Sequence, residues 1–240
     1  EARGKSIINI SDVAHAYRFV TPLNVAEKSA DPCHVDVVCS EGNNWRDQIR
    51  SVARIQIKEG PSFGFCTGTV VNNVRQDCTP YFLTAFHCGE TSSIADLNQT
   101  IFYFNYERPT CGSGIAPTSQ SMTGATRIAD DGGCGGTRGS DFLLLEINDT
   151  IPAAYNVFYA GWNANTSPSP SGVCIHHPAA DEKKISTYTN TLTSTSGFCI
   201  PNTHWRVFWA ATANGHGVTE VGSSGSPIFD NNGRIVGTLT

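Results

Sequence analysis

Three residues far apart in the sequence have side chains that can together perform acyl transfer, namely His87, Asp141 and Ser224. Ser224 lies in Gly222-Ser223-Ser224-Gly225-Ser226-Pro227, where glycines on both sides of the serine permit a tight turn and leave room for a substrate. A nucleophilic serine needs such a turn, because its hydroxyl must stand clear of its own backbone and near N–H groups that stabilise an oxyanion. Taken alone, the segment also fits an ordinary Gly/Ser loop of a β protein.

The two partners of a nucleophilic serine have plausible positions as well. His87 ends the run Leu83-Thr84-Ala85-Phe86, and Cys88 follows it directly, so a disulfide at Cys88 would fix the backbone beside a general base. Asp141 opens an apolar run, and a partly buried carboxylate is costly unless it is paired or well hydrogen-bonded. The alternatives are a half-buried histidine at a strand end and an aspartate that caps a loop.

The order of the three residues along the chain is more informative than any one of them. His87, Asp141 and Ser224 occur in the order of the chymotrypsin-type triad, which differs from the subtilisin and α/β-hydrolase orders. In that mechanism His87 takes the proton of Ser224, and Asp141 holds the imidazole tautomer. The backbone N–H groups of Gly222 and Ser224 would form the oxyanion hole, and the reaction needs no cofactor.

The composition restricts the class of protein. The chain has 240 residues, 15% of them charged and 39% hydrophobic, and a formal net charge of −5. This apolar content argues against disorder, and the mild acidity gives no electrostatic footprint for nucleic acid. The apolar runs are far too short to cross a bilayer. We expect protein or peptide substrates as partners, no nucleic acid, no membrane and a monomer.

Short apolar segments separated by Gly, Asn, Ser and Pro predict an all-β fold with barrels or sandwiches. The segments are rich in Val, Ile, Thr, Tyr and Phe, and no long window has helical periodicity. The predicted strands include Ser51 to Lys58, Cys66 to Asn72, Tyr81 to Ala85, Ile101 to Tyr106, Asp141 to Ile147, Val157 to Trp162, Val173 to His177, Trp205 to Ala210, Pro227 to Asp230 and Arg234 to Thr240.

The nine cysteines are scattered, which favours disulfides in an oxidising compartment and hence a secreted protein. A zinc site needs tightly spaced ligand pairs, so we expect no metal. His176 and His177 are adjacent on a predicted strand, where side chains point to opposite faces, so we interpret both as structural. An odd cysteine count fits either a partner beyond Thr240 or a free thiol.

Several motifs resemble those of chymotrypsin-like serine endopeptidases, and above all those of bacterial lysyl endopeptidases. Thr84-Ala85-Phe86-His87-Cys88, Asp141-Phe142-Leu143-Leu144-Leu145 and Gly222 to Pro227 are similar to the three triad blocks. The resemblance to lysyl endopeptidases covers roughly residues 31–240. Its other segments are Cys33 to Cys39, Tyr81 to Ala85, Ala160 to Trp162, Ile175 to Pro178, Glu182 to Ser186 and Gly217 to Val221.

The resemblance implies a trypsin-like fold of two antiparallel, six-stranded-type β-barrels. Residues 31–150 would form the first barrel with His87 and Asp141, and 151–240 an incomplete second barrel with Ser224. Residues 1–30 would be a plain N-terminal extension or the end of a pro-segment cut after Lys28. Ser223 stands where animal relatives carry the aspartate that pairs with a new N-terminal amine, so we expect that zymogen switch to be absent. The resemblance also implies lysine specificity.

The resemblance further implies disulfides. Cys66–Cys88 would be the family's histidine-loop bridge, Cys39–Cys111 matches the lysyl endopeptidase pattern, and Cys33 would pair beyond Thr240. For the remaining four cysteines we favour Cys174–Cys199 and Cys78–Cys134, although spacing does not determine connectivity. Two other classes of protein stay open, namely a catalytically inactive binding module of the same fold and an esterase.

Overall fold

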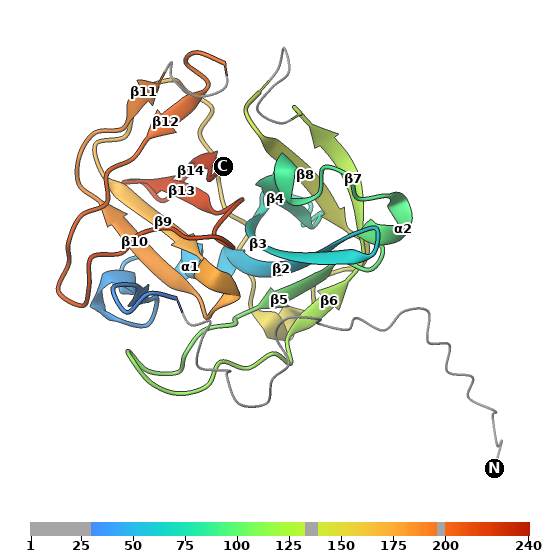
Figure 1. The fold of residues 1–240 in the computed structure, drawn as a ribbon, viewed down its shortest axis with the longest axis horizontal. Coiled ribbons are helices and arrows are strands. Elements are labelled where there is room, and N and C mark those ends of the chain that lie inside the picture. Colours follow the sequence, from blue (N-terminus) through green and yellow to red (C-terminus); the bar gives the residue numbers. More distant parts are fainter. Residues whose placement is uncertain (1–29, 133–138, 196–199) are drawn as a thin grey trace.

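The structure is a computed structural model that describes residues 30–132, 139–195 and 200–240. The described residues form two groups of antiparallel strands (Figure 1). No helix among them is long and apolar enough to span a membrane. The short helices are α1 (Arg46–Ser51), α2 (Ile94–Leu97), η2 (Ser40–Gly42), η3 (Phe86–Cys88), η4 (Ala153–Tyr155) and η5 (Pro178–Ala180).

The first sheet has seven strands in the order β6-β5-β2-β3-β4-β8-β7. Its two edge strands, β6 and β7, are separated by Gly124 alone, so the sheet curls until its edges meet at that residue, which has a φ of 95°. The strands are β2 (Val52–Glu59), β3 (Ser62–Val71), β4 (Tyr81–Ala85), β5 (Ile101–Phe104), β6 (Ser121–Thr123), β7 (Ala125–Asp130) and β8 (Phe142–Ile147).

The second group contains a five-stranded sheet in the order β1-β10-β9-β13-β14 and the separate pair β11-β12. The prediction placed residues 31–150 in the first barrel, whereas the short strand β1 pairs with β10 in the second sheet. Val35 is 2% exposed and packs with Val173 and Ile185, far along the chain. The strands are β1 (Val35–Asp36), β9 (Gly172–His176), β10 (Lys184–Tyr188), β11 (Thr193–Thr195), β12 (His204–Arg206), β13 (Pro227–Asp230) and β14 (Ile235–Thr238).

Successive side chains of β8 point to opposite faces of the strand and contact the cores of both groups of strands. Leu143 and Leu145 are fully buried in the core of the first sheet. Leu144, on the opposite face, is partly buried against the core of the second sheet. Because side chains of a strand alternate between its faces, the apolar run predicted for this region builds two cores at once.

One predicted strand is not formed. Residues 157–162 make only isolated parallel bridges, between Ala160 and Val71 and between Trp162 and Ile235. This segment connects the two sheets instead of lying within either one, which local sequence does not reveal. Trp162 is half exposed and donates its indole N–H to Asn72 O at 3.0 Å, whereas Trp205 is partly buried in a core cluster.

Candidate active site

The short helix η3 follows β4 directly and carries His87, and β4 contacts β14 of the second group of strands. The residue that follows it, Cys88, forms a disulfide with Cys66 of β3. The backbone on the C-terminal side of the histidine is therefore covalently tied to a neighbouring strand, as the sequence predicted. The imidazole itself stays accessible, since 42% of the His87 side chain is exposed.

Asp141 is bound to the histidine through both carboxylate oxygens. Oδ2 lies 2.7 Å from His87 Nδ1, and Oδ1 accepts the backbone N–H of His87 at 3.0 Å. The carboxylate is 2% exposed, and the hydroxyl of Thr240 also donates to Oδ2. Asp141 has a φ of 54°, a left-handed conformation, while its carbonyl accepts the N–H of Phe86 at 2.8 Å. The main chain and the side chain of Asp141 thus both fix the histidine segment.

The pKa of His87 is raised and that of Asp141 is lowered, as expected for a hydrogen-bonded ion pair. The hydrogen bond to Asp141 raises the pKa of His87 above its ordinary value, against the opposing effect of burial. Burial tends to raise the pKa of Asp141, but the hydrogen bonds from His87 and Thr240 outweigh it and lower that pKa. At neutral pH the aspartate is therefore ionised and favours an imidazolium beside it.

The serine loop lies against the strand that leads to the histidine. Gly225 has a φ of 81°, and a Cβ there would lie 2.8 Å from the backbone nitrogen of Ala85 and would collide with Thr84 Oγ1. Gly222 has a φ of 96°, and a Cβ there would lie 2.9 Å from the carbonyl oxygen of His177. Both glycines are thus required by conformation and by close packing. Ser224, between them, is partly exposed.

The structure does not join all three predicted residues by hydrogen bonds. Within residues 30–132, 139–195 and 200–240, His87 is bonded to Asp141, but no hydrogen bond connects its imidazole to the Ser224 hydroxyl. Hydrogen bonds between a catalytic base and its nucleophile are often long in the absence of substrate. The loop is held beside the histidine strand instead by its own backbone contacts.

The backbone of the loop leaves two N–H groups without a partner in the described part of the chain, those of Gly222 and Ser224. The carbonyl preceding Gly222 accepts the N–H of Ala179 at 2.7 Å, and the carbonyl preceding Ser224 accepts the N–H of Ser226 at 3.0 Å. Because C=O and N–H point in opposite directions across a trans peptide, anchoring these carbonyls turns both N–H groups outward. These are the two groups that the sequence predicted for an oxyanion hole.

A chain of hydrogen bonds between uncharged side chains anchors Ser223 of the serine loop to β9 and β10. Ser186 Oγ donates to Val218 O at 2.9 Å, so it accepts from His176 Nε2 at 3.0 Å. His176 Nδ1 then accepts from Ser223 Oγ at 2.8 Å, and that oxygen accepts the N–H of Glu220 at 3.2 Å. Burial, with the nearby charges of His34 and Lys184, lowers the pKa of His176 well below its ordinary value, so the ring is neutral.

Comparisons with known proteins agree with these features. The family model described as lysyl endopeptidase, C-terminal domain, matches residues 27–240. The lysyl endopeptidase of Pseudomonas aeruginosa is 34% identical over 206 residues, which cover 82% of this chain. The chain belongs to the lysyl endopeptidase family. It spans 41% of the length of the Pseudomonas relative.

Solved structures confirm the all-β, trypsin-like fold that was predicted for this lysyl endopeptidase family member. Rv3671c of M. tuberculosis H37Rv, in an inactive form, has a TM-score of 0.51 and 16% identity, covering 88% of this chain and 85% of that one. An HtrA-type protease with a bound tripeptide has a TM-score of 0.52 and 12% identity, covering 84% of this chain and 57% of that one.

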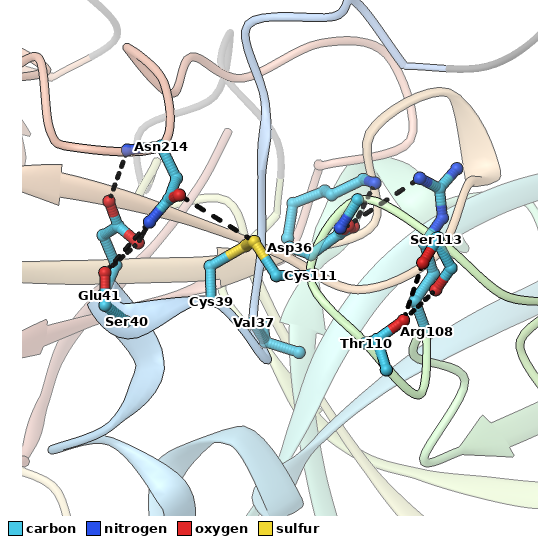
Figure 2. The surroundings of a disulfide bond; sticks show 12 residues. Asp36, Val37, Cys39, Ser40, Glu41, Arg108, Thr110, Cys111, Ser113 and Asn214 are labelled. Carbon is cyan, nitrogen blue, oxygen red and sulfur yellow. Dashed lines mark hydrogen bonds and ion pairs between the residues drawn. A yellow bond between two sulfur atoms is a disulfide. The ribbon is translucent and has the colours of Figure 1, made fainter.

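Among the described residues of this family member, the structure confirms two of the predicted disulfide pairs. Cys39–Cys111 and Cys66–Cys88 are formed. Figure 2 shows the first, beside the amide of Asn214, which donates to Glu41 Oε2 at 2.8 Å. Cys33 has no disulfide partner among the described residues, so its pairing beyond Thr240 stays a prediction.

The predicted pairs Cys174–Cys199 and Cys78–Cys134 stay predictions, and Cys174 and Cys78 have no disulfide partner among the described residues. Cys174 lies in β9 and is fully buried, with its pKa raised by that burial to about 12, whereas Cys78 is exposed. Their expected partners, Cys199 and Cys134, lie outside the described residues.

No metal site competes with this interpretation among the residues that the structure describes. The single group of potential ligands there is Cys66, His87 and Cys88, and both of its sulfurs are in a disulfide. The His176 imidazole forms hydrogen bonds with Ser186 and Ser223. The His177 imidazole forms a separate one with the carbonyl oxygen of Asp181.

Sequence reasoning missed three residues that hold the site together, namely Thr240, Ser186 and Thr67. Thr240 is the last residue of the sequence and is bonded to Asp141. Ser186 lies in a segment that the sequence marked only as a family motif. Thr67 follows Cys66 directly, and this adjacency was the one signal that could have found it.

Proposed function

We propose that this protein is a secreted serine endopeptidase in which Ser224 is the nucleophile, His87 the general base and acid, and Asp141 the residue that orients the imidazole. One observation carries the proposal. The carboxylate of Asp141, which is 2% exposed, lies 2.7 Å from Nδ1 of an imidazole that is 42% exposed. The serine loop beside them has glycines with positive φ on both sides of Ser224. An exposed imidazole oriented by a buried carboxylate is what base catalysis by histidine requires.

The mechanism follows from the fixed tautomer. Because Asp141 Oδ2 accepts a hydrogen bond from the protonated Nδ1, the unprotonated Nε2 of His87 is the acceptor for the proton of the Ser224 hydroxyl. The resulting alkoxide attacks the carbonyl carbon of a peptide bond, and the imidazolium then gives its proton to the leaving amine. Water enters the acyl-enzyme by the same proton transfers, and the serine is restored without a cofactor.

The oxyanion of the tetrahedral intermediate needs donors that do not reorganise during the reaction. The N–H groups of Gly222 and Ser224 are suited to this role, because they lack partners in the described part of the chain and their peptide carbonyls are anchored. Losing one such donor in a serine protease costs roughly 3–4 kcal/mol of transition-state stabilisation. The arrangement therefore supports Gly222 and Ser224 as the oxyanion hole.

We infer that the substrates are proteins or peptides and that the bond cleaved follows a lysine. The support is the name of the Pseudomonas aeruginosa relative, lysyl endopeptidase. Secretion is supported by the two disulfides, since such bonds persist in oxidising compartments. We further propose that residues 1–30 are the end of a pro-segment cut after Lys28, and N-terminal sequencing of the mature protein tests this site.

The test of the proposed function is covalent labelling with a fluorophosphonate, followed by mass spectrometry. The wild-type protein should be labelled at Ser224 and should cleave peptides, with lysine substrates preferred. Ser224→Ala should abolish both labelling and cleavage, whereas Ser167→Ala, in an exposed loop, should change neither. An unlabelled, inactive wild-type protein would favour a binding module of the same fold, and cleavage of esters but not of peptides would favour an esterase.

A further inference from the structure

Thr67 is the residue at which the first sheet is bonded to the serine loop. It lies in β3, is fully buried, and uses all of its polar groups. Its hydroxyl donates to Gly222 O at 2.9 Å and accepts the N–H of His177 at 3.0 Å. Its backbone N–H donates to Ser224 O at 2.8 Å, and its carbonyl accepts the hydroxyl of Thr84 at 2.8 Å.

We propose that Thr67 is a positioning residue for the nucleophile, acting through the two carbonyls that flank Ser223 and Ser224. This inference rests on the proposed function. The Gly222 carbonyl belongs to the peptide unit that leads to Ser223, and the Ser224 carbonyl to the unit that leads to Gly225. Thr67 thus fixes the two peptide units on either side of the Ser223–Ser224 unit. The carbonyl of that middle unit accepts the N–H of Ser226 at 3.0 Å, which turns the Ser224 N–H to the opposite side.

The other ends of the same peptide units show that the loop has one hydrogen-bonded arrangement. The N–H of Ser223 donates to Glu220 O at 2.9 Å, and the N–H of Gly225 donates to Leu239 O at 2.7 Å. Rotation of either unit would break a bond to Thr67 and a second bond on the opposite side. The hydroxyl of Thr67 therefore favours the orientation in which the oxyanion donors are exposed to substrate.

The same residue also connects the serine loop to the histidine. The preceding residue, Cys66, is bonded to Cys88, next to His87. Thr84, which donates to the Thr67 carbonyl, lies in the strand that ends one residue before η3. Thr67 is thus a common reference point for the nucleophile and the base, and a shift there changes their separation. Misplacing reacting groups by about 1 Å can cost a factor of about 100 in rate.

Valine has nearly the shape of threonine, so Thr67→Val removes the hydroxyl alone and leaves Gly222 O and His177 N without that partner. A general loss of stability must be separated from a loss of positioning. Thr69 provides the matched control, since it lies two residues along the same strand, is also fully buried, and bonds Ser51 Oγ at 3.0 Å, away from the serine loop. Thr67→Ser keeps the hydroxyl and tests rescue.

The experiment measures kcat, KM and the rate of fluorophosphonate labelling for the three variants in the full-length protein, together with Tm. We expect Thr67→Val to lower kcat and the labelling rate by about tenfold or more, with KM changed by less than about threefold. Thr67→Ser should restore most of this loss. The acidic limb of the pH profile should not move, because the His87–Asp141 pair is untouched.

Thr69→Val should lower Tm without lowering kcat, since its hydroxyl does not contact the loop. The inference is overturned if Thr67→Val and Thr69→Val lower Tm similarly and both leave kcat and labelling unchanged, or if Thr67→Ser is as slow as Thr67→Val. Labelling of the wild-type protein and its loss in Ser224→Ala establish the proposed function beforehand, so failure of that function is seen independently of Thr67.

Discussion

The histidine side and the serine side of the site are held by different kinds of interaction. On the histidine side, a disulfide and a buried carboxylate hold the imidazole. On the serine side, Cys174 of β9 has no disulfide partner among the described residues, and an uncharged hydrogen-bond chain through Ser223, His176 and Ser186 supports the loop. The difference follows the chemistry that we propose for each side.

An imidazole that takes a proton changes its charge, so a fixed anion beside it stabilises the state that forms. The loop carrying the serine must instead keep its N–H groups outward, and a buried charge beneath it would need a partner of its own. Hydroxyl groups and an uncharged imidazole can support the loop without a buried counter-charge. The following predictions test this division, from the largest expected effect to the smallest.

Removing the anion should have the largest effect. Asp141→Asn should lower kcat by about 10⁴-fold, as in the serine protease template, because the imidazole is then held in the wrong tautomer. In the wild-type protein the pKa of His87 is raised, so activity should appear above about pH 6.5, the ordinary value for histidine. In the variant this limb should move to lower pH. Steady-state kinetics across pH measures both effects.

The same variant should affect stability in a defined direction. The pKa of His87 is raised on folding, so its contribution is fully present below about pH 6.5 and is lost as pH rises through the folded value. The pKa of Asp141 is lowered, so its contribution is present above about 3.9 and is lost as pH falls. Asp141→Asn should therefore reduce the free energy of unfolding more at about pH 6 than at about pH 9. A loss independent of pH would contradict an ionic support.

The two disulfides should separate stability from activity. Cys39–Cys111 closes a separation of 72 residues and Cys66–Cys88 one of 22. The chain-entropy estimate gives about 4 and about 3 kcal/mol for them. Replacing each pair by serine should therefore destabilise the first variant more, whereas kcat should fall more in the second. Chemical denaturation and kinetics on the two variants test this, and equal kcat values would show that the bridge next to His87 does not position it.

Breaking the hydrogen-bond chain through Ser223, His176 and Ser186 should reduce the free energy of unfolding by a smaller amount, and this reduction should not depend on pH. Ser223→Ala leaves His176 Nδ1 and the N–H of Glu220 unpaired in a buried place, so we expect a loss of about 1–3 kcal/mol in the free energy of unfolding. Because the pKa of His176 is far below its ordinary value, this loss should be the same at about pH 7 and about pH 9. Urea denaturation at both pH values measures it, and a marked pH dependence would indicate a charged His176.

The smallest effect concerns Cys78 and Cys174, which have no disulfide partner among the described residues. Cys78 is exposed and should react with a maleimide in the folded protein, without loss of activity. Cys174 is fully buried and burial raises its pKa to about 12, so it should react only after unfolding. Peptide mapping of the labelled protein distinguishes the two sites. Labelling of folded Cys174 would show that the core behind the serine loop opens.

Local patterns predicted the strands best where one strand is apolar throughout or alternates cleanly. Tyr81–Ala85 and Pro227–Asp230 were predicted with the bounds that the structure has. β10 (Lys184–Tyr188) was not predicted as a strand, because Lys183 just before it and Lys184 at its start are charged residues in a segment that is buried. Lys183 is fully buried with its ammonium on Ile49 O at 2.9 Å, and Lys184 contacts Asp36, partners that no local window contains.

The types and order of His87, Asp141 and Ser224 are properties of the sequence, and so is the need for glycine beside the serine. These features follow from what each side chain can do and from which backbone conformations it permits. Tertiary structure alone decided that β1 joins the second sheet, that Cys174 is fully buried, and that Thr67 contacts the serine loop. Such pairings depend on which surfaces are buried together, and burial is a property of the whole chain rather than of any segment.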